Sequence, residues 1–170
     1  ESVNQDKLDN ILIAASDVYD QGVVGLIASK LVEEFYRPSI AISIGDIISK
    51  GSARSIPGVN IIELIRSVPE FLKEAGGHPM AAGFSIETKN LDGFKTTLIK
   101  KANDQISSEL FDRVLKIDTE LSFNLIHQEL YDAIQTLAPF GMENPSPIFF
   151  FFVVTVVSTN RVGKNKEHMQ

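Results

Sequence analysis

The sequence predicts an α/β (α+β) fold in which helices cover a sheet, followed by part of a second, β-rich domain. Up to about residue 106, short apolar runs typical of buried strands alternate with segments whose apolar residues recur at helical spacing. Beyond that point the chain turns acidic and then contains an apolar, β-rich run at 148–157. The alternation of strand-like and helix-like segments before residue 106 is typical of a sheet covered by helices.

The first third of the chain predicts three strands and one helix. Residues 11–15 form an apolar run, and the turn-rich stretch 16–22 follows it. The helix after this turn has apolar residues every four positions, namely Val23, Ile27, Leu31 and Phe35. Arg37-Pro38 ends this helix, because proline disfavours the helical conformation of the residue before it. Residues 40–44 favour a second buried strand, and 49–56 favour a third.

Two further helices, a strand and a longer helix are expected before residue 107. Asn60 can cap a short helix. The string Ser67-Val68-Pro69-Glu70 has the spacing of a capping box with proline in the first turn, so a fresh helix is expected from there. Its expected end is Gly76-Gly77, where a glycine can adopt the left-handed conformation. Residues 80–86 favour a strand and 91–106 an amphipathic helix.

A domain boundary is expected within residues 107–113, dividing the chain into 1–106 and 107–170. The second part predicts a strand at 114–123 and a helix at 126–137, then a loop rich in proline. The apolar run after the loop includes four consecutive phenylalanines, Phe149 to Phe152. They could stack on bases, but adjacent strand residues face opposite sides, so a core role is favoured.

The charge excludes a uniformly cationic nucleic-acid binder. The 170 residues hold 16 basic and 22 acidic side chains, a net charge of −6 at pH 7. Residues 1–20 and 103–132 contribute −4 and −5, which leaves the rest at +3. The absence of cysteine excludes a disulfide scaffold, a thiolate metal site and a cysteine nucleophile.

The termini and hydropathy predict a cytoplasmic protein that does not enter a membrane. No apolar run approaches the roughly 20 residues that span a bilayer, and no export signal opens the chain. The sequence begins at Glu1 without an initiator methionine, so we expect it to be part of something longer.

The most informative string is Gly76-Gly77-His78-Pro79-Met80-Ala81-Ala82-Gly83. Its small residues leave the backbone accessible, so a ligand or a second segment can come close. His78 is a candidate hydrogen-bond donor to phosphate or a general acid or base, because imidazole serves in either state near neutral pH. The alternative is a helix end followed by a small-residue strand, with a buried core histidine.

A second candidate site is Lys50-Gly51-Ser52-Ala53-Arg54-Ser55. In a strand Ser52 and Arg54 point to the same face, where they could hold a phosphate through the guanidinium and the hydroxyl. The alternative is a solvated edge guarded by Lys50 and Arg54.

Other signals are less specific. Asp20 precedes a predicted helix start with Gly22 and Gly25, which would allow an anion to approach, but a capping carboxylate is the simpler interpretation. A turn near Gly163 carries three bases that could contact a nucleic-acid backbone or simply face solvent, namely Arg161, Lys164 and Lys166. The three histidines form no metal-ligand spacing, so the sequence predicts no metal ligands in this chain.

Together these strings resemble the RecJ single-strand-specific exonucleases of the DHH phosphoesterase superfamily. Five strings carry the resemblance: 19–29, Tyr36-Arg37-Pro38, 50–55, 76–83 and Pro139-Phe140-Gly141-Met142-Glu143-Asn144-Pro145. The glycine-histidine string is shared by the wider superfamily, whereas the strings 50–55 and 139–145 narrow the match. Two positions depart from the family pattern: Tyr19-Asp20 replaces Trp-His, and Glu143 replaces glycine.

The resemblance implies a DHH-associated substrate-binding domain at 1–106 and the start of an OB-type barrel in 107–170, whose Phe-rich strand would be exposed. It implies a 5′→3′ exonuclease of single-stranded DNA in recombination and repair, with Mn²⁺ or Mg²⁺ held by a preceding DHH domain, so this chain alone would be inactive. Ser52 and Arg54 would bind the 5′-terminal phosphate. His78, Gly76 and Gly77 would line the catalytic cleft. Lys50, Arg161 and Lys164 are further candidate contacts to DNA, on the basis of their own sequence positions.

Two other functions stay open from the sequence. One is a non-catalytic nucleic-acid-binding or assembly module that retained this fold. The other is an RNA-directed DHH phosphoesterase or a tRNA-editing relative, against which the segment after residue 110 argues. The sequence leaves the oligomeric state open.

Overall fold

The computed structural model describes residues 8–141, 143–152, 154–155, 157–164 and 168–169. The chain divides into two compact units, Glu1–Arg113 and Val114–Gln170, and each is described by itself. Within the described residues, no helix is long and apolar enough to cross a membrane.

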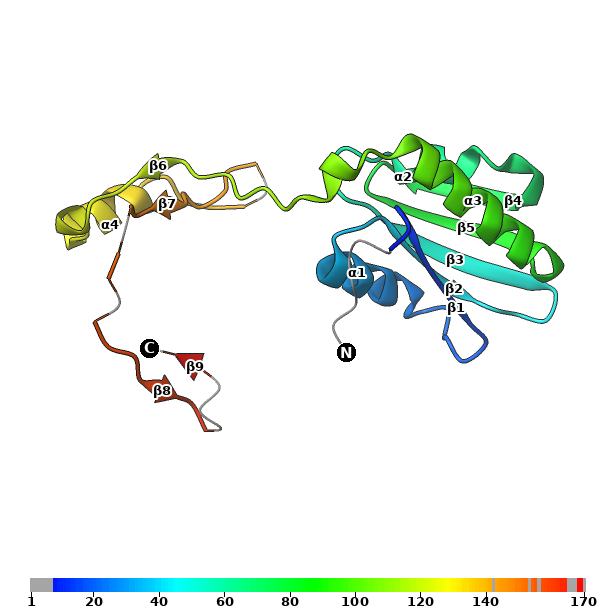
Figure 1. The fold of residues 1–170 in the computed structure, drawn as a ribbon, viewed down its shortest axis with the longest axis horizontal. Coiled ribbons are helices and arrows are strands. Elements are labelled where there is room, and N and C mark those ends of the chain that lie inside the picture. The colour runs from blue at the N-terminus through cyan, green and yellow to red at the C-terminus, as the bar shows by residue number, and fades with distance from the viewer. Residues whose placement is uncertain (1–7, 142, 153, 156, 165–167, 170) are drawn as a thin grey trace. The chain divides into compact units, whose positions relative to one another are not determined.

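The first unit is built on a five-stranded mixed sheet with the order β1-β2-β3-β5-β4. The strands are β1 (Leu12–Ser16), β2 (Ser39–Ser43), β3 (Ile48–Arg54), β4 (Leu72–His78) and β5 (Ala81–Glu87). Strands β1 and β2 are parallel, and the other neighbours are antiparallel. The parallel pair requires a crossover, which helix α1 (Val24–Phe35) provides (Figure 1).

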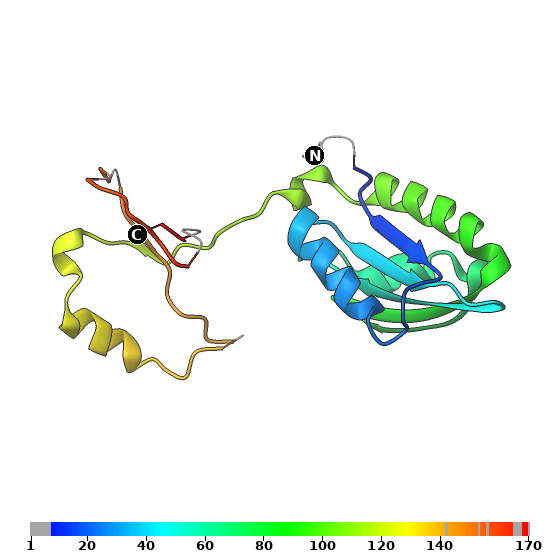
Figure 2. The same cartoon turned by 90° about the horizontal axis from the view of Figure 1, so that it is seen from below.

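Helices lie on both faces of this sheet. Helix α1 covers one face, and α2 (Ile61–Arg66) and α3 (Leu91–Gln105) cover the other, as Figure 2 shows for α1 and α3. The main core lies beneath α2 and α3, where Phe84 of β5 packs against Phe94 of α3 with ring centroids 5.0 Å apart. A small cluster of Val24, Ala28 and Ala41 fixes α1 over β2. Helix α1 reaches β3 but leaves the α1-side face of β5 and β4 open.

The predicted α/β fold class is confirmed, and so are most of its elements. The strands expected at 11–15, 40–44, 49–56 and 80–86 form within two residues of those bounds. Helix α3 matches the helix predicted at 91–106. Asn60 caps α2 as expected, because its side chain accepts a hydrogen bond from the Glu63 N–H at 3.4 Å.

The helix predicted from Ser67 to Gly77 is wrong. Only a 3-10 turn forms at Pro69–Phe71, and the chain then enters β4. The capping box is absent, since the Ser67 hydroxyl donates to the Leu64 carbonyl at 2.7 Å instead. The physical reason is tertiary: residues 72–78 pair with β5 in antiparallel register, and this long-range pairing overrides the local helix signals. Gly76 and Gly77 are therefore strand residues.

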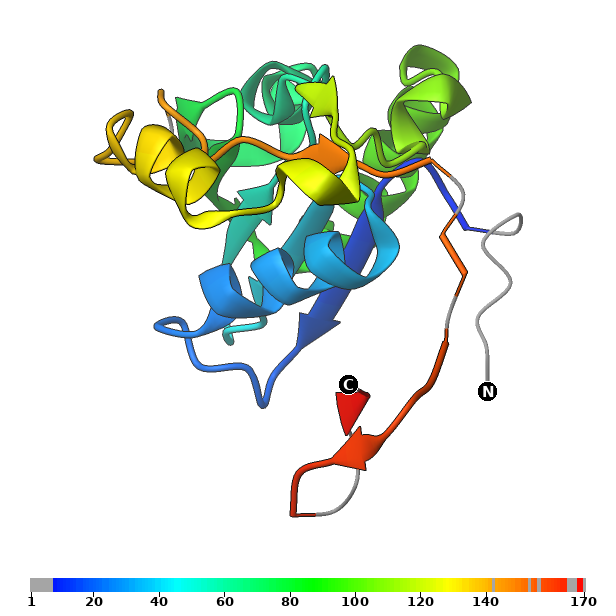
Figure 3. The same cartoon turned by 90° about the vertical axis from the view of Figure 1, so that its left-hand side faces the viewer.

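The second unit has sparse regular structure. Its elements are β6 (Thr119–Glu120), α4 (Gln128–Gln135), β7 (Phe149–Phe150), β8 (Arg161–Val162) and β9 (His168–Met169). Figure 3 shows α4, β7 and β8; the described residues 145–148 and 157–160 between them have no regular structure. Strands β6 and β7 pair in parallel and β8 pairs with β9, so the described residues do not form a closed barrel. Short 3-10 turns complete the two units: η2 (Pro69–Phe71), η3 (Thr88–Asn90), η4 (Ser108–Phe111) and η5 (Phe123–Leu125).

The strand predicted at 114–123 forms only at Thr119–Glu120, where Phe149–Phe150 lies opposite. On either side of that pairing, the N–H groups of Asp118 and Leu121 donate to the carbonyls of Ile148 and Phe150 at 2.9 and 2.8 Å. Phe151 stacks on Phe123 with centroids 4.6 Å apart, whereas Phe152 is 71% exposed. The phenylalanine run is thus divided between internal contacts and the surface.

Candidate functional site

The face of β3, β5 and β4 that α1 leaves uncovered carries the predicted site residues in ordered rows. Residues that face each other across the strands form three rows: Lys50–Ser85–Glu74, Ser52–Gly83–Gly76 and Arg54–Ala81–His78. Because side chains alternate along a strand, all three rows project to the same side. We call this set of residues the open face.

Ser52 and Arg54 come together on β3 as their spacing predicts. The Arg54 Nη1 donates to the Ser52 Oγ at 3.0 Å and to the Ala53 carbonyl at 2.9 Å. The guanidinium is half-buried, and within the described residues no acidic side chain forms an ion pair with it. Arg54 is therefore oriented by its own strand, with positive charge left for a ligand.

Gly25 in the first turn of α1 makes room for this arrangement. A Cβ at Gly25 would lie 3.0 Å from the Arg54 Nη2 and 3.4 Å from the Ser52 Oγ. The hydrogen bonds of α1 begin with the N–H groups of Leu26 and Ile27, which donate to the Val23 carbonyl. The guanidinium and the hydroxyl thus meet the positive end of a helix, a combination that favours anions.

Asp20 does not cap this helix, contrary to the simpler interpretation of its sequence position. The N-cap is Val23, and the Asp20 Oδ1 accepts from the Gly22 N–H at 2.7 Å in the preceding turn. The helix start is therefore not occupied by its own carboxylate. The sequence associates Gly25 with close approach, but it does not indicate that Arg54 fills the space beside it.

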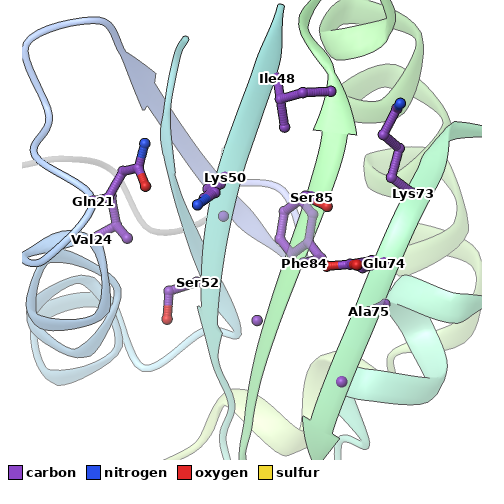
Figure 4. Close-up of a pocket in the computed structure, with 13 residues that line it drawn as sticks. Gln21, Val24, Ile48, Lys50, Ser52, Lys73, Glu74, Ala75, Phe84 and Ser85 are labelled. Atoms are coloured by element: carbon purple, nitrogen blue, oxygen red, sulfur yellow. The ribbon is translucent and has the colours of Figure 1, made fainter.

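A cleft of about 1150 Å³ opens over the first two rows (Figure 4). Its lining residues include Gln21 and Val24 beside the start of α1, Lys50 and Ser52 on β3, Ser85 on β5 and Glu74 and Gly76 on β4. Of the predicted site residues, Lys50, Ser52 and Gly76 line this cleft. Arg54 and His78 stand in the adjoining row and are not among the lining residues.

His78 is exposed at the end of edge strand β4, so the alternative of a buried core histidine is wrong. Its Nδ1 accepts a hydrogen bond from the Met80 N–H at 3.3 Å, and no other hydrogen bond of this side chain is found among the described residues. Ala81 separates His78 from Arg54, so their Cα atoms lie two interstrand spacings apart, about 10 Å.

Gly77 has a backbone role. Its φ is +144°, and a Cβ there would lie 2.3 Å from the Ala81 carbonyl oxygen. Gly76, in contrast, has no atom within 4 Å of its Cβ position. The two neighbouring glycines therefore differ: Gly77 permits the strand pairing, and Gly76 keeps the cleft floor open.

Arg161 and Lys164 belong to the second unit and are exposed. Arg161 lies in β8, and Lys164 follows Gly163, whose φ is +97°. The turn therefore presents basic side chains to solvent, which is compatible with either interpretation of its sequence. Lys166 lies outside the described residues.

Each unit is matched by a family model. The family model described as the DHHA1 domain matches residues 8–108, more than half of the chain. The chain belongs to the DHHA1 family. The model described as the RecJ OB domain matches residues 117–170 of this DHHA1 chain.

Relatives of this DHHA1 chain are named as single-stranded-DNA-specific exonuclease RecJ. The Bacillus subtilis RecJ is 35% identical over 173 residues, a match that covers all of this chain and 22% of the relative. The Haemophilus influenzae RecJ is 29% identical, covering 89% of this chain and 27% of that protein. The resemblance to RecJ seen in the motifs is confirmed, and the chain spans about a fifth to a quarter of the length of these relatives.

Solved RecJ structures share the fold. RecJ from Thermus thermophilus in complex with Mn²⁺ superimposes with a TM-score of 0.80 at 24% identity, covering 94% of this chain and 24% of that one. The same protein in complex with Mg²⁺ gives a TM-score of 0.73 at 25% identity, covering 85% and 23%.

The described residues of this DHHA1 chain do not fit such a metal site. They contain no group of three or more His, Cys, Asp or Glu side chains placed to hold an ion. Mn²⁺ and Mg²⁺ prefer several oxygen ligands, and Glu74 is the only carboxylate among the residues of the open face. We therefore assign no metal-dependent step to these residues.

Proposed function

We propose that this chain is the DNA-positioning part of a 5′→3′ exonuclease of single-stranded DNA, with Ser52 and Arg54 holding the 5′-terminal phosphate. The observation that carries the proposal is the convergence of the Arg54 guanidinium, the Ser52 hydroxyl and the start of α1 beside Gly25. The names of the relatives support the same substrate class.

The charge of this site favours a strand end over the strand interior. A terminal phosphate monoester carries about −1.5 to −2 at pH 7, whereas an internal diester carries a single negative charge. A half-buried guanidinium without an acidic partner in the described structure gains most from the more highly charged group. Ser52 and Arg54 would therefore select the end at which degradation begins.

His78, Gly76 and Gly77 would border the path of the strand from this phosphate to the reacting bond. Because the Nδ1 of His78 accepts a hydrogen bond from the backbone, its Nε2 can donate to a phosphate oxygen, as a supporting group. Lys50 would contact the DNA inside the cleft, and Arg161 and Lys164 would contact its backbone from the second unit. The metal ions would be held outside this chain, in a DHH domain of the intact enzyme, which would act in DNA recombination and repair in the cytoplasm.

The test is Arg54→Ala in the intact enzyme, compared on single strands with a 5′-phosphate and with a 5′-hydroxyl. We expect the rate on the phosphorylated strand to fall at least tenfold, and the rate on the hydroxyl strand to change little. Lys100→Ala removes a charge from α3, on the opposite side of the sheet, and serves as the matched control. Equal losses on both strands would reject the assignment of the phosphate to Arg54.

A further inference from the structure

The floor of the cleft beside Ser52 is flat and unoccupied by side chains. Gly83 and Gly76 continue the Ser52 row across β5 and β4. No atom lies within 4 Å of a Cβ position at Gly76, and the nearest to that of Gly83 is the Gly51 carbonyl at 4.0 Å. A planar group as wide as two strands can therefore lie directly on the backbone here.

The next row places an unpaired hydroxyl in the same cleft. Ser85 is only 9% exposed, lines the cleft, and forms no side-chain hydrogen bond within the described part of the chain. The Ser85 Oγ is not fully buried, so it is open to a ligand from the cleft side. A ligand group that reaches the cleft floor would complete the hydrogen bonding of Ser85.

Lys50 and Glu74 flank Ser85 from β3 and β4 and both line the cleft. They do not form an ion pair with each other or with another described residue. The row thus presents an ammonium donor, a hydroxyl and a carboxylate acceptor in line. It lies two residues along β3 from Ser52, a distance of about 7 Å.

This mixture of groups suits a nucleobase better than a second phosphate. A carboxylate repels phosphate, but it accepts hydrogen bonds from the exocyclic amino groups of cytosine, adenine and guanine. Lysine and serine can donate to base oxygens and ring nitrogens. Thymine lacks an exocyclic amino group and offers only its ring N3–H, between two carbonyl oxygens that repel a carboxylate, so it suits Glu74 less well.

We propose that the row Lys50–Ser85–Glu74, with the floor of Gly76 and Gly83, holds the base of the terminal nucleotide whose phosphate lies at Ser52 and Arg54. This inference rests on the proposed function, because that phosphate sets the register of the nucleotide. It predicts a preference among 5′-terminal bases, with cytosine, adenine and guanine favoured over thymine.

The decisive variant is Gly76→Val, which fills the floor without disturbing the strand. A Cβ at this position meets open space, and valine is favourable in a strand, so the melting temperature should not fall. Binding of the 170-residue chain is measured by anisotropy to two 5′-phosphorylated oligonucleotides that differ only in the first position, one cytosine and one abasic. The unmodified chain should bind the cytosine strand about fivefold more tightly.

Gly76→Val should weaken the cytosine strand more than the abasic strand and so remove most of this difference. Ser85→Ala should weaken the same strand roughly threefold, the amount expected for one hydrogen bond. Lys100→Ala is the control for both. Equal weakening of the two strands by Gly76→Val, or equal affinity of the unmodified chain for both, would overturn the base site.

Glu74→Gln should shrink the preference for a terminal cytosine over a terminal thymine, since the carboxylate is lost. An unchanged preference would contradict this role of Glu74.

The proposed function can fail independently of the base site. If removal of the 5′-phosphate, or Arg54→Ala, leaves the affinity for the cytosine strand unchanged, the phosphate site at Ser52 and Arg54 is wrong. If binding still depends on the 5′-phosphate but Gly76→Val weakens the cytosine and abasic strands equally, only the base site is rejected.

Discussion

Gly76 and Gly77 are adjacent in β4, but a methyl group would meet different surroundings at each. At Gly76 the Cβ would enter open space above the cleft floor. At Gly77 it would lie 2.3 Å from the Ala81 oxygen and 2.6 Å from the Ala82 Cα, with φ at +144°. The first glycine is thus available for binding, and the second is required by the pairing of β4 with β5.

We predict that Gly77→Ala lowers the free energy of unfolding by about 1–3 kcal/mol, because the substituted backbone is strained. Gly76→Ala should leave stability unchanged or raise it by about 0.5 kcal/mol, because alanine reduces the entropy of the unfolded chain. Urea denaturation of the two variants gives the comparison. A similar loss in both would show that Gly76 also has a structural role.

Gly25 permits the Arg54 guanidinium to lie against α1, so Gly25→Ala separates binding from stability. Alanine favours a helix over glycine by about 1 kcal/mol, and the melting temperature should hold or rise. The added methyl group would lie 3.0 Å from the Arg54 Nη2 and displace the guanidinium. This displacement should weaken binding of a 5′-phosphorylated strand severalfold. Unchanged phosphate affinity would mean that the position of Arg54 against the helix is unimportant.

Among the elements, β4 is the one whose secondary structure could not be predicted from the sequence alone. Residues 91–105 become a helix as predicted, because a long amphipathic repeat is strong local information. Residues 72–78 include helix-compatible residues and a Gly-Gly end signal, but they pair with β5 and become a strand. That pairing depends on the sheet order, which one sequence does not reveal.

The candidate site, like the fold, is predictable from the sequence only where it depends on local pattern. Ser52 and Arg54 share a face because of strand alternation, which the sequence shows directly. The alignment of Gly76 with Gly83 and of Glu74 with Ser85 depends on the register of β4, which was predicted as a helix. The floor of the cleft could therefore not be anticipated.

The end of β5 is tied to its neighbours by ion pairs. The Glu87 carboxylate lies 2.7 Å from the Lys89 Nζ and 3.5 Å from the Lys73 Nζ on β4. The hydrogen bond and charge of Lys89 hold the pKa of Glu87 below its usual value, with a smaller contribution from Lys73. Glu87 raises the pKa of Lys89 in turn.

Because the pKa of Glu87 is lower in the folded chain, its contribution to stability is present above the ordinary carboxyl pKa. It is lost as the pH falls through the lowered value. We predict that Lys89→Met moves the pKa of Glu87 upward more than Lys73→Met does, as followed by NMR titration of the carboxyl group. The reverse order would assign the main interaction to β4. Both lysine partners are exposed, so added salt should diminish the shift.

At the scale of the whole molecule, the segment before residue 114 is held to the first unit. The Arg37 guanidinium lies 3.9 Å from the centroid of the Phe111 ring, and Arg113 lies 5.3 Å from that of Tyr36. Arg113 also donates to the carbonyls of Glu33 and Glu34 at the end of α1, where a cation is favoured. These contacts explain why the units divide after Arg113, at the far end of the expected boundary segment.

The net charge of −6 does not oppose the proposed function, because the acidic residues are concentrated elsewhere. Residues 1–20 and 103–132 carry the excess of acid, and the phosphate site on the open face carries Arg54 with no acidic partner among the described residues. The chain therefore has a local anion site within an acidic whole. Binding should depend on the strand end more than on overall charge.

The most direct test of the central claim is the affinity of the 170-residue chain for one short single strand bearing either a 5′-phosphate or a 5′-hydroxyl. The proposed phosphate site predicts that the phosphate tightens binding about tenfold, and that Arg54→Ala abolishes this gain whereas Lys100→Ala preserves it. Equal affinity for the two strand ends would contradict a terminal-phosphate site at Ser52 and Arg54.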